Sequence, residues 1–160
     1  MKTSLGLSDL DDDLLLCKTH LETTNTKGTQ IESFLTRFLL VHICGEYEKE
    51  IKRIMIERAQ QSGDLALSSY VEKSIERVRN IKTGDLRGNI LNRFSENCLV
   101  FFNSRIKDTE SEARYNNIIT NRDYGAAHGG IINITFDELL ISHNKAKEVL
   151  QVVSDALNHI

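Results

Sequence analysis

Apolar side chains recur every three or four residues through most of the chain, which is the spacing of amphipathic α-helices. The pattern predicts a first helix over about 8–24, a long second helix over about 30–61 and a final helix over about 136–157. The chain contains no proline, so such segments keep their backbone hydrogen bonds intact. The sequence therefore predicts an all-α fold, and it shows no internal repeat or second domain boundary.

Residues suited to capping helices mark the starts of several segments. Each candidate pairs a hydroxyl side chain with an acidic residue three positions later: Ser8 with Asp11, Thr29 with Glu32, Ser69 with Glu72, Thr109 with Glu112, and Thr135 with Glu138. The third pair predicts a short helix after the break at 62–64, and the fourth predicts a helix that ends at Arg122. The apolar run 99–102 fits either a helix or a short buried connector.

The long second helix carries an apolar stripe that we expect to face the core. Its members are Ile31, Phe34, Leu35, Phe38, His42, Ile51, Ile54 and Met55. His42, and His143 on the final helix, both fall on apolar stripes. We interpret both as hydrogen-bonded core histidines.

Composition is that of an ordinary globular protein. The chain has 160 residues, of which 40% are hydrophobic and 27% charged, and this length can bury a substantial core. No apolar run approaches the roughly 20 residues that cross a bilayer, and the acidic residues near the N-terminus argue against a signal peptide. We therefore expect a cytoplasmic protein that makes no membrane contact.

The three cysteines are an odd number and lack Cys-x-x-Cys spacing, which argues against a disulfide framework or a zinc ribbon. Cys17 and His20 could form half of a metal site, but no second pair at ligand spacing follows. We expect reduced core thiols and neither a metal nor a cofactor.

Charge supports nucleic-acid binding only locally. The 20 Lys and Arg residues are outnumbered by 23 Asp and Glu residues, giving a formal charge of -3, whereas dedicated nucleic-acid binders are usually strongly basic. The middle third is richer in cations, namely Lys73, Arg77, Arg79, Lys82, Arg87 and Arg93. These form either a basic strip for RNA or ordinary solvated helix faces.

The most informative segment is 119–130, Ile-Thr-Asn-Arg-Asp-Tyr-Gly-Ala-Ala-His-Gly-Gly. Arg122 can hold a phosphate oxygen in a bidentate fork, His128 can transfer protons near neutral pH, and the glycines let backbone come close to a ligand. The alternative is a cation that favours a helix C-terminus, followed by a polar residue before a glycine cap.

The order Arg122, Asp123, four intervening residues, His128 and Gly129 resembles the signature of the HEPN superfamily, and in particular its RiboL-PSP-like branch. The resemblance extends over about residues 30–157. It implies one HEPN-like domain over residues 1–160, built as an all-α bundle with a four-helix core plus short extra helices, with the motif at 121–129.

Helix geometry limits how the motif can work. On an unbroken helix Arg122 and His128 would point about 120° apart and lie about 9 Å apart along the axis. Either Gly125 lets the chain fold His128 back, or two copies assemble the site across a twofold axis. The resemblance favours the second option and implies a homodimer whose motifs line one cleft.

The resemblance also implies an activity, that of a metal-independent endoribonuclease of the toxin or phage-defence type. His128 of one protomer would deprotonate a ribose 2′-hydroxyl, a second His128 would protonate the leaving 5′-oxygen, and Arg122 would stabilise the phosphorane charge. Asn121 and Asp123 are expected supporting residues, and Tyr124 either stacks on a base or packs at the dimer seam. The implied partners are RNA, a second copy of the chain, and an antitoxin or a nucleotidyltransferase.

Two other functions stay open. Some HEPN proteins act without catalysis, as binding modules for a nucleotide or a nucleotidyltransferase partner. The chain could also be an unrelated helical adaptor or immunity protein, in which Arg122 and His128 would be incidental.

Overall fold

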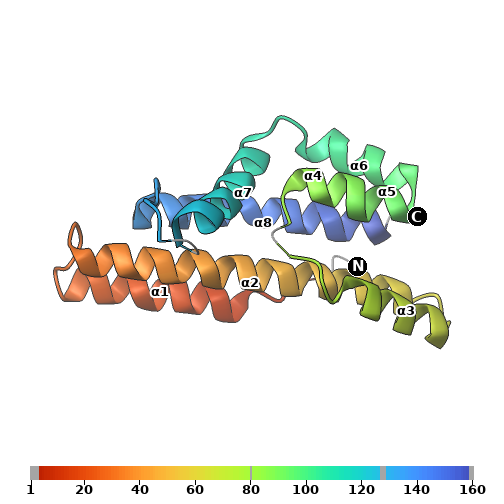
Figure 1. Cartoon of the computed structure of the whole chain (residues 1–160), viewed down its shortest axis with the longest axis horizontal. Helices are drawn as coiled ribbons and strands as arrows, with labels where there is room; N and C mark the ends of the chain where they lie inside the picture. The colour runs from red at the N-terminus through yellow and green to blue at the C-terminus, as the bar shows by residue number, and fades with distance from the viewer. Residues whose placement is uncertain (1–3, 80, 127–128, 159–160) are drawn as a thin grey trace.

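The computed structural model describes residues 4–79, 81–126 and 129–158, and every regular element within these ranges is helical (Figure 1). The longest elements are α1 (Ser8–Thr23), α2 (Gln30–Gln60) and α8 (Phe136–Asn158), where the sequence predicts long helices. The shorter ones are α3 (Leu65–Ile75), α4 (Thr83–Asp85), α5 (Asn92–Phe94), α6 (Glu96–Ile106), α7 (Glu110–Asn121) and two π-helical turns, η1 (Leu86–Leu91) and η2 (Arg122–Ala126). The all-α prediction is confirmed.

The helices form a bundle around α8 (Figure 1). Helices α1 and α2 run antiparallel side by side, and α8 packs against α2 on one side and against α6 and α7 on the other. Helix α3 lies along the end of α2. The η2 turn follows α7 and packs on α2, so α2 is shared by the candidate motif and the core.

The core contains large aromatic side chains from four helices. Tyr47, Phe102, Tyr115 and Phe136 are all fully buried. Tyr47 of α2 stacks on Tyr115 of α7, with ring centroids 5.5 Å apart. Because a buried aromatic removes a large apolar area from water, these contacts hold α2, α6, α7 and α8 together.

A polar network crosses the core beside this stack. The Tyr47 hydroxyl lies 2.8 Å from His143 Nδ1, and His143 Nε2 lies 2.8 Å from Asp11 Oδ1. Lys147 Nζ donates to the same Asp11 oxygen at 2.9 Å. Because His143 is only 1% exposed, its interpretation as a hydrogen-bonded core histidine is confirmed. His42, by contrast, is half-buried and lies against Asp13 rather than in the core.

Three of the predicted caps are present. Thr29 Oγ1 accepts a hydrogen bond from the Ile31 amide at 3.2 Å, and Thr109 Oγ1 accepts one from the Glu112 amide at 3.2 Å. Thr135 and Glu138 form a reciprocal capping box, because each side chain accepts a hydrogen bond from the other residue's amide. These contacts satisfy donors that a helix start leaves unpaired.

Two of the predicted caps are wrong. Ser8, the predicted cap of α1, is the first residue of the helix, and Leu7 precedes it without a side-chain cap. Asp11, the predicted partner of Ser8, instead binds His143 of α8. Helix α3 starts at Leu65 rather than near Ser69, because Asp64 Oδ1 accepts hydrogen bonds from the amides of residues 66 and 67. The apolar run 99–102, for which two structures were open, is helical and belongs to α6.

The predicted stripe of α2 is also wrong in its first half. Phe34 is 67% exposed and Phe38 is 60% exposed. The residues that enter the core there are Thr36, Leu39, Leu40, Ile43, Cys44 and Tyr47. The N-terminal half of α2 therefore has two apolar faces, and one of them lies at the surface.

All three cysteines are free, with Cys44 and Cys98 buried and Cys17 half-buried. In the described ranges, none of the helices combines the length and the apolar character that a membrane crossing requires.

Candidate active site

Helix α7 places Arg122 at its C-terminal end, as the sequence predicts. Its start is fixed on both sides, because Glu112 Oε2 accepts a hydrogen bond from the Asp108 amide at 2.8 Å while Thr109 caps the helix. Tyr115, Ile118 and Ile119 are buried and hold it against the bundle. The backbone of Arg122 is still helical, and its amide donates to carbonyls of the last turn.

Arg122 begins the π-helical turn η2, and residues 130–132 lie against this turn. A Cβ on Gly125 would lie 2.3 Å from Ile132 Cγ2, and a Cβ on Gly130 would lie 2.3 Å from the Tyr124 carbonyl oxygen. Neither distance is possible for real atoms. A side chain at either position would force the neighbouring atoms to shift, because residues 130–132, which follow the motif, lie directly against the turn.

Asn121 ties the two sides of this turn together. Its Oδ1 accepts a hydrogen bond from the Asn133 amide at 2.8 Å, and its Nδ2 donates to the Asn117 carbonyl at 3.0 Å and to Asn117 Oδ1 at 2.9 Å. The side chain is only 7% exposed. Its geometry suits positioning of the motif rather than contact with a substrate.

The guanidinium of Arg122 is incompletely satisfied. Its side chain is 24% exposed, and Nη1 lies 3.3 Å from Asp123 Oδ1. Nε is buried and has no hydrogen-bond acceptor among the described residues. A buried donor without a partner costs about 1–3 kcal/mol, so this arrangement is unfavourable for the protein alone.

Arg122 also acts on the core beneath it. Burial raises the pKa of the Cys44 thiol to about 12, and the positive charge of Arg122 opposes this rise. Because Cys44 belongs to α2, the Arg122 guanidinium lies close enough to α2 for its charge to lower the pKa of a thiol there. The thiol remains protonated at neutral pH.

The remaining predicted site residues lie around the turn. Asp123 pairs with Arg122 and is half-buried, whereas Tyr124 is 72% exposed and open to a ligand or a partner. His128 lies outside the described residues. The chain on either side of it, at Gly125 and Gly130, is described and is held at the turn.

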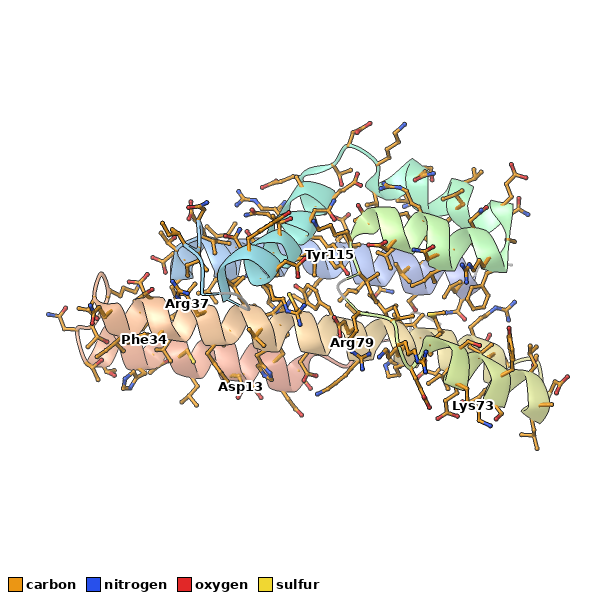
Figure 2. All side chains as sticks on the ribbon, viewed as in Figure 1. Asp13, Phe34, Arg37, Lys73, Arg79 and Tyr115 are labelled. Atoms are coloured by element: carbon orange, nitrogen blue, oxygen red, sulfur yellow. The ribbon has the colours of Figure 1, made fainter. Side chains whose placement is uncertain are left out.

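Arg37 is a second cation at this turn, and sequence reasoning missed it. Its Nη1 donates to the Gly125 carbonyl oxygen at 3.3 Å, across 88 residues of sequence. Figure 2 shows Arg37 and Phe34 together on the N-terminal half of α2. In the sequence, Arg37 is marked only by its place between the apolar residues Phe34 and Phe38. That place indicates a site residue only once Phe34 and Phe38 are known to be exposed.

Four exposed apolar residues line this part of α2 at helical spacing: Ile31, Phe34, Phe38 and Val41. We call them the α2 stripe. Positions three or four apart share one face of a helix, and Arg37 lies within the same stretch. The stripe is thus an apolar surface beside the candidate site, of a kind that marks interaction surfaces.

The six cations of the middle third are not all free to bind RNA. Arg87 is half-buried and bound to Glu112 Oε1 at 2.5 Å and to Asn103 Oδ1 at 2.6 Å. Arg79 lies 3.9 Å from Glu48 beside α2, while Lys73 points outward from α3 (Figure 2). The basic-strip interpretation is therefore wrong for Arg87, which stabilises α7 instead.

Within the part of the chain that the structure describes, His, Cys, Asp and Glu side chains form no group of three or more that could hold a metal ion.

Comparison with known families gives one match. A model of the family described as RiboL-PSP-HEPN matches residues 7–159. Comparisons with curated proteins and with solved structures gave no match.

Proposed function

This chain belongs to the RiboL-PSP-HEPN family, and from that premise we propose that it is a metal-independent endoribonuclease of the toxin or defence type. The family indicates a nuclease or RNA-related function. The observation that supports the finer assignment is the Arg122 guanidinium, which is partly exposed, fixed at a helix end and left with an unpartnered Nε.

In the proposed reaction, His128 removes the proton from a ribose 2′-hydroxyl. The 2′-oxygen attacks the adjacent phosphorus, the bond from phosphorus to the 5′-oxygen breaks, and a second His128 protonates that oxygen. The products are a 2′,3′-cyclic phosphate and a 5′-hydroxyl. Arg122 stabilises the negative charge on the phosphorane oxygens.

The free state of Arg122 fits such a role. A phosphate would attract the side chain towards solvent, where Nε and the Nη groups can donate to its oxygens in a fork. That movement would relieve the unpartnered Nε and loosen the contact with Asp123, which is already long at 3.3 Å. Asp123 would then orient the guanidinium, while its own charge would weaken phosphate binding.

We further propose that two copies of the chain pair along the α2 stripe. The stripe lies beside the turn, because Arg37 from the same stretch of α2 binds the Gly125 carbonyl. Pairing there would remove Phe34 and Phe38 from water and bring two motifs towards one groove. Exposed Tyr124 would lie at the edge of that groove, against a base or the partner.

Cleavage is tested by incubating purified protein with RNA in a chelator and identifying the product ends. We expect cyclic phosphate ends, and no cleavage when the ribose at the scissile position lacks its 2′-hydroxyl. His128→Ala should abolish the reaction, whereas the matched variant His20→Ala, which changes an exposed histidine of α1, should not. Products that require added divalent metal would contradict the mechanism.

Pairing is tested through Phe34→Glu and Phe38→Glu, with light scattering and RNA cleavage measured together. We expect monomers with little activity and an intact fold. The matched control is Leu65→Glu, which charges an 86% exposed leucine on α3 and should leave both properties unchanged.

A mixing experiment tests whether both histidines are needed. Wild-type protein and His128→Ala are mixed in equal amounts and allowed to exchange subunits. If each active dimer requires two intact His128 side chains, the mixture retains about one quarter of the activity of wild-type protein at the same total chain concentration. About three quarters would mean that one histidine per dimer suffices, and about one half would mean that each histidine contributes independently of the other. A protein that binds RNA or a nucleotide without any cleavage would instead be a binding module.

A further inference from the structure

A cavity of about 550 Å³ lies between the C-terminal end of α2, helix α3 and the segment η1–α5. The candidate active site contacts α2 near Arg37, whereas the cavity begins at Met55, so the two sites lie at different parts of the same helix. Figure 1 shows α3 along the end of α2, far from α7. The cavity volume falls within the range of small-molecule sites.

The floor of the cavity is apolar. Met55 and Ala59 of α2, Ile75 of α3 and Ile90 of η1 all line it, and all four are buried. Two large side chains of α3 that also line the cavity are exposed: Leu67 is 45% exposed and Tyr70 is 70% exposed. A ligand with an apolar body would cover this surface and gain free energy in proportion to the area buried.

The charged groups of the lining all have one sign. Arg58 on α2 and Arg93 on α5 line the cavity, and no carboxylate does. Arg58 donates a hydrogen bond to Gln61 Oε1 at 3.3 Å. Among the described residues neither arginine forms an ion pair, in contrast to Arg53, which lies five residues before Arg58 on α2 and pairs with Glu50 at 2.6 Å.

We propose that this cavity binds an amphipathic anion, a molecule with an aliphatic or aromatic body and a single carboxylate or phosphate head. The body would lie on Met55, Ile75 and Ile90. The head would lie between Arg58 and Arg93, where a guanidinium from each side can donate to its oxygens. This proposal is independent of the RNA-cleaving function.

The test is calorimetric titration of the full chain with four ligands that share a twelve-carbon tail, kept below their micelle concentrations. Dodecanoate and dodecyl phosphate carry anionic heads, dodecyl maltoside a neutral one and dodecyltrimethylammonium a cationic one. We expect the two anions to bind at least about tenfold more tightly than the other two. The ratio between the two anions shows whether a carboxylate or a phosphate is preferred.

Variants then locate the site. Arg58→Gln with Arg93→Gln should weaken binding of both anions about tenfold and leave the neutral ligand unchanged. The charge-matched control is Arg77→Gln, because Arg77 is exposed and does not line the cavity. Ser74→Phe should fill the cavity and reduce binding of every ligand, whereas Ser74→Ala should not.

Amide chemical shifts give a measurement that needs no variant. Shifts caused by dodecanoate should be confined to α3, η1–α5 and the C-terminal end of α2. Absence of binding, equal affinity for all four head groups, or shifts centred on α7 and η2 would each overturn the proposal.

Discussion

Two polar clusters pack against α2, and they differ in how completely their hydrogen bonds are satisfied. Around His143 both ring nitrogens have partners at 2.8 Å, and the side chain is sealed in the core. Around Arg122 one contact is long, one donor is unpartnered and the side chain is partly exposed. The first arrangement stabilises the fold, whereas the second leaves donors for a ligand. The comparison separates effects on stability from effects on activity.

The largest expected effect is on the activity of Arg122→Gln. Loss of one charged donor at a developing oxyanion typically costs about 2.7–4 kcal/mol, which is a rate reduction of about 10²–10³-fold. Because Arg122 makes only one long contact and has one unpartnered donor, the free energy of unfolding should change by no more than about 1 kcal/mol. RNA cleavage rates and urea unfolding measure the two effects.

Arg77→Gln is the control, since it removes an equal charge from an exposed position. A fall in stability of Arg122→Gln that accounts for its loss of activity would place Arg122 with His143 as a structural residue.

Tyr47→Phe should show the opposite behaviour. It deletes the hydroxyl that binds His143 Nδ1 and leaves that nitrogen buried without a partner, which costs about 1–3 kcal/mol. Urea unfolding should show this loss, while the cleavage rate per folded molecule should not change. Tyr124→Phe is the matched control, because the Tyr124 side chain is 72% exposed and should affect stability by less than about 0.5 kcal/mol.

Gly125→Ala should be intermediate and should affect both properties. The new methyl group would overlap Ile132 Cγ2, and overpacking of this kind costs about 1–3 kcal/mol. The turn that carries Arg122 must then shift, so cleavage should fall as well. Gly45→Ala on α2 is the control, because a Cβ there meets nothing within 4 Å. Unchanged stability in Gly125→Ala would show that the return of the chain is less tight than described.

Around the candidate site, the sequence predicts the helices better than it predicts the contacts between distant segments. Residues 109–122 and 135–138 carry local signals, namely caps and helical spacing, and these signals suffice for α7, α8 and the placement of Arg122. The contact between Arg37 and Gly125 has no such signal, because it joins positions 88 residues apart.

The α2 stripe shows a second limit. Helical periodicity identifies apolar faces, but it does not decide which of two faces on one helix enters the core. Phe34 and Phe38 match the helical pattern as well as Leu39 and Ile43 do, yet only the second pair is buried. Packing by α7 and α8 makes that choice, and it is a property of the whole bundle rather than of the segment. An apolar face that the bundle leaves uncovered is available for a partner.

The smallest expected effect is the pH dependence of the His143 cluster. Burial lowers the pKa of His143 below its ordinary value, and the hydrogen bond to Asp11 opposes only part of that shift. Unfolded histidine titrates near 6.5, so between 6.5 and the lower folded pKa the unfolded chain binds more protons. The stability contribution is therefore complete above about pH 6.5 and decreases as the pH falls towards the folded pKa.

Asp11 adds a second decrease at lower pH. Burial alone would raise its pKa, but hydrogen bonds from His143 and Lys147 outweigh that effect and lower it. Its contribution is present above the unfolded value and is lost as the pH falls through the folded pKa. Urea unfolding from pH 8 to pH 5 should show the His143 effect in the wild type and not in His143→Gln. An identical pH dependence in both proteins would mean that protonation of this cluster does not control stability. The contrast between the satisfied His143 cluster and the incompletely satisfied Arg122 cluster would then depend on the Arg122 variants alone.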